Sequence, residues 1–130
     1  MPNSIETYFQ AMLDAAENMP LVSASNIVLD KRTNHAGLIR GDLYFIDASR
    51  LHFRELVEVQ EFPVRLMYSY HYQGGGDELI FRYDDTPHYP DLPGFPHHKH
   101  VQLESRVTPS QPPDLHTVLA EITELFLAKM

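Results

Sequence analysis

The chain has 130 residues, of which 18 are acidic, 10 are Lys or Arg and 8 are His, and a domain of this size can bury its own apolar core. Because it contains no Cys, a disulfide scaffold, a Cys-ligated metal and a cysteine nucleophile are excluded, and the formal charge of -8 argues against broad binding of nucleic acid. It has no apolar run of about 18 residues and no basic leader, so we expect a cytoplasmic protein with no membrane partner.

The first expected element is a helix over residues 4–18. Asn3 and Glu6 have the spacing of a capping box, and apolar residues then repeat at helical intervals. Pro20 ends this helix, and residues 21–29 read more weakly as a strand.

Three strand-like runs follow, at residues 37–47, 50–60 and 63–73, and the short polar connections between them favour antiparallel pairing. The last run alternates most clearly. It puts Leu66, Tyr68, Tyr70 and Tyr72 on one face, with Met67, Ser69 and His71 on the other. For the tyrosines we favour core packing over stacking with nucleic-acid bases.

After a glycine turn at 74–76, we expect a strand at 79–83, a proline-rich loop at 84–97, a short strand at 101–107 and a final helix capped by Asp114. The fold class is therefore α+β. One domain, residues 1–130, holds an antiparallel sheet of five or six strands flanked by an N-terminal and a C-terminal amphipathic helix.

The titratable residues gather around the proline-rich loop. Four of the 8 histidines lie between positions 88 and 100: His88, His97, His98 and His100. If the two strands beside the loop pair, strand alternation places Arg82 and Asp84 beside His98 and His100 on one face. His97 and Lys99 then point to the other face, unless the segment is irregular.

Three interpretations of this cluster remain open. In the first, one imidazole is a general base and another a general acid, Asp84 orients a histidine, and Arg82 or Lys99 stabilises charge at phosphorus, as in metal-independent ribonucleases. In the second, His98, His100 and Asp84, with His88 as a further candidate, bind a divalent metal. In the third, the cluster is structural. For the cluster as a whole we favour a functional role.

Glu55 is a separate candidate, because it places a carboxylate on an otherwise apolar strand face. It has the chemistry of a base or a metal ligand, but pairing with an arginine is the favoured explanation.

Two sequence blocks, Phe81-Arg82-Tyr83-Asp84-Asp85-Thr86-Pro87-His88 and Phe95-Pro96-His97-His98-Lys99-His100, resemble the TumE family, the toxin halves of small bacterial toxin-antitoxin operons. The resemblance covers nearly the whole chain. It implies growth inhibition that is neutralised by a cognate antitoxin, often one with a DNA-binding domain. The positions that match the polar motif of the family are Arg82, Asp84, His88, His97, His98, Lys99 and His100, with Glu55 matching a recurrent strand carboxylate.

Taken together, the sequence predicts a TumE-like toxin that cleaves RNA without a cofactor. The alternatives are a non-catalytic binding protein that uses the histidine-rich loop as a docking surface, and a metal-dependent hydrolase. RNA binding should be confined to the loop and strengthen as the histidines become protonated. An exposed sheet edge would serve for docking of the antitoxin or for a homodimer.

Overall fold

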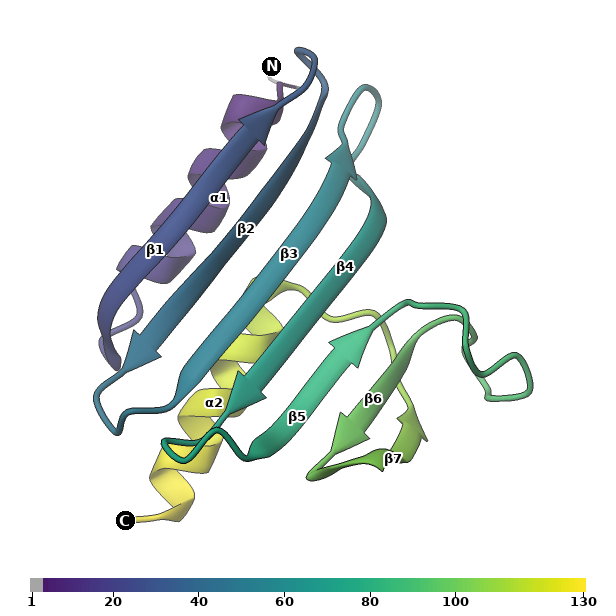
Figure 1. Ribbon diagram of the computed structural model, residues 1–130. Coiled ribbons are helices and arrows are strands. Elements are labelled where there is room, and N and C mark those ends of the chain that lie inside the picture. Colours follow the sequence, from purple (N-terminus) through teal and green to yellow (C-terminus); the bar gives the residue numbers. More distant parts are fainter. Residues whose placement is uncertain (1–3) are drawn as a thin grey trace.

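The computed structural model describes residues 4–130 and has a helix before and after an antiparallel sheet, which confirms the α+β class (Figure 1). The helices are α1 (Ile5–Glu17) and α2 (Leu115–Ala128). Ser4 caps α1 by accepting a hydrogen bond from the backbone N of Thr7, and Asp114 caps α2 as predicted. The cap predicted at Asn3 lies outside the described residues.

The sheet follows chain order, so each strand pairs with its neighbours in sequence (Figure 1). Its seven strands are β1 (Val22–Lys31), β2 (Ala36–Phe45), β3 (Arg50–Glu58), β4 (Val64–Gln73), β5 (Leu79–Asp84), β6 (His98–Val101) and β7 (Leu103–Pro109). The expected count of five or six was too low because the last predicted strand is a hairpin. Gln102 takes a positive φ of 66° and turns the chain there, so that β6 and β7 pair with each other.

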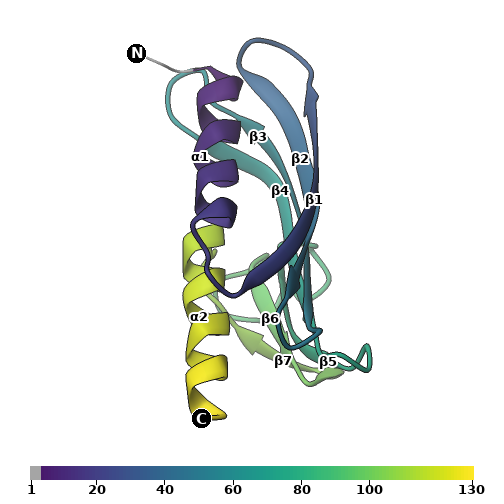
Figure 2. The ribbon, with the colours of Figure 1, turned by 90° about the vertical axis from the view of Figure 1, so that its left-hand side faces the viewer.

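Both helices cover the same face of the sheet and lie end to end along it (Figure 2). Tyr68, Tyr70 and Tyr72 point into the core beneath them and are at most 2% exposed, as expected. The prediction for Leu66 was wrong, because this residue is 59% exposed. The register between β3 and β4 shifts by one residue at this point, and Leu66 is the extra residue of the bulge.

The face of the sheet opposite the helices carries the polar members of the alternating strands. Two adjacent rows of paired residues run across it from β2 to β6. One row is Arg40, Arg54, Ser69, Asp84 and His98, and the other is Asp42, His52, His71, Arg82 and His100. We call this surface the outer face. Within residues 4–130, no helix is long and apolar enough to cross a membrane.

Candidate functional site

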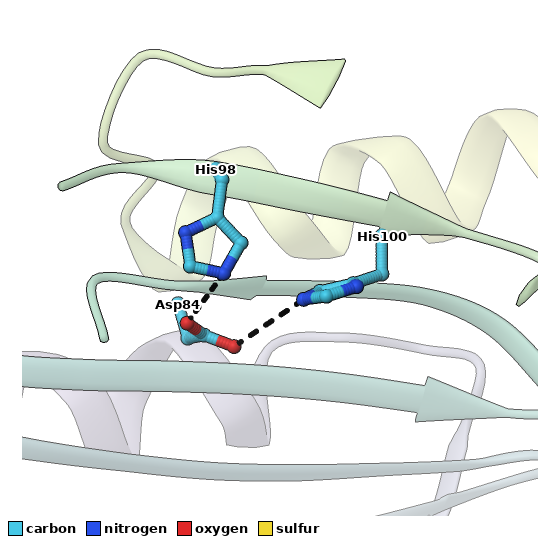
Figure 3. Close-up of side chains that lie close together, drawn as sticks. All are labelled: Asp84, His98 and His100. Carbon is cyan, nitrogen blue, oxygen red and sulfur yellow. Dashed lines mark ion pairs between the residues drawn. The ribbon is translucent and has the colours of Figure 1, made fainter. Parts of the chain in front are cut away.

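The centre of the site is a cluster of Asp84, His98 and His100, where β5 pairs with β6 on the outer face (Figure 3). The register pairs Asp84 with His98 and Arg82 with His100, so strand alternation brings these residues together as the sequence predicted. The three cluster residues are 7%, 2% and 3% exposed. Buried polar groups of this kind need partners; each imidazole has a backbone carbonyl on one side and faces the carboxylate of Asp84 on the other.

The two imidazoles are held in the same way. Nδ1 of His98 lies 2.9 Å from the carbonyl oxygen of Pro96, and Nδ1 of His100 lies 2.7 Å from that of Glu104. A carbonyl can only accept, so both Nδ1 atoms carry a hydrogen. Each Nε2 therefore points at Asp84, at 2.9 Å from Oδ1 for His98 and 4.0 Å from Oδ2 for His100.

Arg82 and a backbone amide hold the carboxylate of Asp84 in place. Arg82 Nε donates to Oδ2 at 3.0 Å, and the backbone N of Thr86 donates to Oδ1 at 3.1 Å. The outer nitrogens of Arg82 make two contacts with Glu104, at 2.6 and 2.7 Å. Burial alone would lower the pKa of Arg82, but its hydrogen bonds to Glu104 and Asp84 outweigh this and raise it. The guanidinium is thus permanently charged beside the cluster.

The cluster forms one wall of a pocket of about 460 Å³, whose lining also includes Arg54, Thr86 and His88. Tyr89, from the proline-rich loop, packs its ring edge-on against His98 and His100, with centroid distances of 5.0 and 6.1 Å. The loop therefore contributes both a wall and the exposed His88 to the pocket.

Three of the sequence candidates lie away from this pocket. His97 stacks on the core residue Tyr68, and its Nδ1 is 2.8 Å from the tyrosine hydroxyl. Lys99 points the other way from His98 and donates to Glu121 of α2 at 2.6 Å. Burial would lower the pKa of Lys99, but its hydrogen bonds to Glu121 and Tyr83 raise it, so it stays charged where it ties β6 to α2.

Glu55, the third of them, lies under the helices and is 1% exposed. It accepts hydrogen bonds from the hydroxyls of Tyr8 and Tyr70 and from Arg65, whose Nη1 is 3.3 Å away. The expected pairing with an arginine is confirmed. Burial, followed by the charge of Glu55, raises the pKa of Tyr8 and of Tyr70, so both phenols remain neutral donors to the carboxylate.

Sequence reasoning missed the basic residues that extend the site across the outer face. These are Arg40, Arg54, His52 and His71. Burial, and then the nearby charge of Arg82, lowers the pKa of His71. The alternation of β3 did indicate this surface, because Arg50, His52 and Arg54 share the face opposite to the buried apolar residues. A single strand, however, supplies too few residues to identify a site.

Comparison with known proteins gives the class. A family model described as Toxin TumE matches residues 12–126, a segment that contains every strand and the whole cluster. The protein is therefore a toxin of a toxin-antitoxin system, with a cognate antitoxin as its partner. It belongs to the TumE family. No curated protein and no solved structure matches the chain.

Proposed function

We propose that the toxin arrests growth by cleaving RNA in the pocket beside Asp84, His98 and His100. The observation that carries this proposal is the arrangement of cations on the outer face. Arg40 and Arg54 are exposed, and no carboxylate in the described part of the chain pairs with either. Both lie in the row that ends at Asp84 and His98. An acidic protein can bind a phosphate chain where its unpaired cations are gathered in this way.

The dimensions of the outer face suit a short stretch of single-stranded RNA. Neighbouring strands are about 4.8 Å apart, so Arg40 on β2 and Asp84 on β5 are separated by about 14 Å. Acidic residues on this path are already paired: Asp42 contacts His52 at 3.1 Å, and Glu104 contacts Arg82. Arg54 and Arg82 both line the pocket, so a phosphate chain that contacts Arg54 lies beside its opening.

The cleavage that fits such a site is attack by the 2'-hydroxyl on the adjacent phosphorus. The P–O5' bond breaks, which leaves a cyclic phosphate and a free 5'-hydroxyl. This step needs a base for the 2'-hydroxyl proton, an acid for the departing oxygen and a cation for the charge at phosphorus. Arg82 is the cation next to the cluster. In the cofactor-free version that the sequence favours, the imidazoles transfer the protons. We give His97, Lys99 and Glu55 no part in this chemistry.

The competing function is a non-catalytic binding protein whose outer face docks a partner. It is favoured by the burial of His98 and His100, whose Nε2 atoms face Asp84 rather than open solvent. For either function we propose that the antitoxin carries a DNA-binding domain, as the family resemblance implies. A homodimer formed through an edge strand is tested by light scattering of the purified toxin.

The deciding experiment compares RNA cleavage by the purified wild type with that by the Arg54→Ala variant. Arg54 is exposed, so its loss should leave the circular dichroism spectrum unchanged while cleavage falls by roughly tenfold, as expected for one lost charged contact. Arg32→Ala, also exposed but in the turn between β1 and β2, is the matched control and should cleave as the wild type does. Equal cleavage by all three proteins would show that the outer face takes no part in RNA cleavage. A folded wild type with growth arrest but no cleavage would favour the docking function.

A further inference from the structure

We propose that Asp84, His98 and His100 bind a divalent transition-metal ion. Binding is a property of the folded chain and does not depend on whether RNA is the substrate. If the ion is bound, the imidazoles serve as metal ligands and no longer transfer protons as in the cofactor-free mechanism.

Each ring has one nitrogen engaged and one left over. Both Nδ1 atoms donate to backbone carbonyls, so a neutral ring has its lone pair on Nε2. Both Nε2 atoms nevertheless point at the oxygens of Asp84 (Figure 3). A lone pair facing a carboxylate is repulsive, and this repulsion is relieved either by a proton on Nε2 or by a metal cation between the groups. A metal ion satisfies all three groups at once.

The distances fit a single ion. One ligand atom from each of the three residues lies within 4.8 Å of the others. Nitrogen and oxygen ligands bind zinc at about 2.1 Å, which in tetrahedral geometry separates neighbouring ligand atoms by about 3.4 Å. The distances from Asp84 to His98 and to His100, 2.9 and 4.0 Å, lie on either side of this value. Small side-chain rotations therefore suffice to bring all three onto one ion.

The groups around the cluster are those that orient metal ligands in proteins. Ligating histidines commonly donate their second N–H to a backbone carbonyl, and ligating carboxylates accept further hydrogen bonds. Pro96 and Glu104 supply the carbonyls, and Arg82 and Thr86 donate to Asp84. Glu104 pairs with Arg82 and so offsets the charge that this guanidinium would direct at an ion.

The ligand set also selects the metal. Two imidazoles and one carboxylate suit zinc, iron, nickel or cobalt, whereas magnesium and calcium prefer oxygen alone. Three protein ligands leave coordination positions open, which is typical of catalytic rather than structural metal sites. Because the cluster lines the pocket, these positions face the space where water or a phosphate oxygen would enter.

The test is a titration of EDTA-treated, full-length protein with Co²⁺, followed by visible absorption, and with Zn²⁺, followed by calorimetry. We expect one ion per chain and an increase in melting temperature with zinc, because binding to the folded state stabilises it. Magnesium should produce neither effect. Asp84→Asn, which keeps the size of the side chain, and His100→Ala should each weaken binding at least 100-fold.

His52→Ala is the matched control. His52 also contacts an aspartate on the outer face, Asp42 at 3.1 Å, but among the described residues these two belong to no group of three side chains that could hold a metal ion. It should bind the ion as the wild type does. If a cluster variant fails to fold, the wild-type titration with zinc and magnesium still decides. A wild type without cobalt bands and without a zinc-dependent melting shift overturns the proposal, as does binding lost in His52→Ala but kept in Asp84→Asn.

The outcome separates this proposal from the proposed function. Binding of one ion without RNA cleavage supports the metal site and excludes the ribonuclease function. Full RNA cleavage in EDTA by a protein that binds no cobalt supports the ribonuclease function and excludes the proposed metal site.

Discussion

Replacing Glu55 with Gln should cost the fold about 3 kcal/mol. The carboxylate is 1% exposed and accepts from Tyr8, Tyr70 and Arg65. An amide keeps one acceptor oxygen but turns an NH₂ group toward one of these donors, and it leaves the partly buried Arg65 without a counter-charge. Breaking a buried pair costs about 3–5 kcal/mol, and relief of the desolvation of Glu55 returns a part.

Urea unfolding followed by circular dichroism measures this loss. With a slope of about 2 kcal/mol per molar, the midpoint should fall by about 1.5 M. Glu6→Gln is the control, because Glu6 pairs with Lys31 at the surface of α1 and its side chain is 58% exposed. It should leave the midpoint where it is. If both variants unfold at the same urea concentration, Glu55 does not hold the helices to the sheet. A folded Glu55→Gln protein that no longer arrests growth would instead indicate that Glu55 takes part in the toxic activity.

Other expected outcomes concern packing, the docking of α2 and pH. Gly37→Ala should destabilise by about 1–3 kcal/mol in urea unfolding, because its Cβ would lie 2.7 Å from the Phe9 ring, whereas Gly76→Ala, which meets a flexible side chain, should change little. Lys99→Met should lower stability by about 1 kcal/mol yet leave growth arrest intact, and loss of arrest in the folded variant would place Lys99 in the site. Burial raises the pKa of several tyrosine hydroxyls, which favours the protonated phenol in the folded state. Stability should then be complete below about pH 10, where unfolded tyrosines ionise, and fall as the pH rises further. Most of the ultraviolet signal of tyrosinate should appear together with loss of the circular dichroism signal, because burial protects five of the seven tyrosines: Tyr8, Tyr68, Tyr70, Tyr72 and Tyr83. Ionisation of these five in the intact fold would contradict the expectation.

The elements that could be predicted are those whose residues repeat within one segment. The apolar spacing of both helices and the alternation of the tyrosines in β4 are local, and so is the alternation that put Arg82 and Asp84 on the face of His98 and His100. One assumption, that the two strands beside the proline-rich loop pair with each other, was enough to assemble the cluster.

The features that were missed depend on contacts between segments. Gln102 adopts a left-handed backbone conformation, and because it is not a glycine the sequence shows no sign of a turn there. Leu66 is exposed because of a β-bulge, which forms only when β4 pairs with β3. Lys99 finds Glu121 only after α2 has docked. The outer face takes one or two residues from each of several strands, so no single run in the sequence reveals it.

The chain-order arrangement of the sheet has a consequence during synthesis. A protein made from its amino end can form β1 to β4 by successive hairpins as it leaves the ribosome. The cluster cannot exist until β6 has been translated and has paired with β5, and Lys99 reaches Glu121 only once α2 has followed. A nascent toxin therefore carries most of its sheet without its pocket. The pocket is thus completed only in the last part of translation.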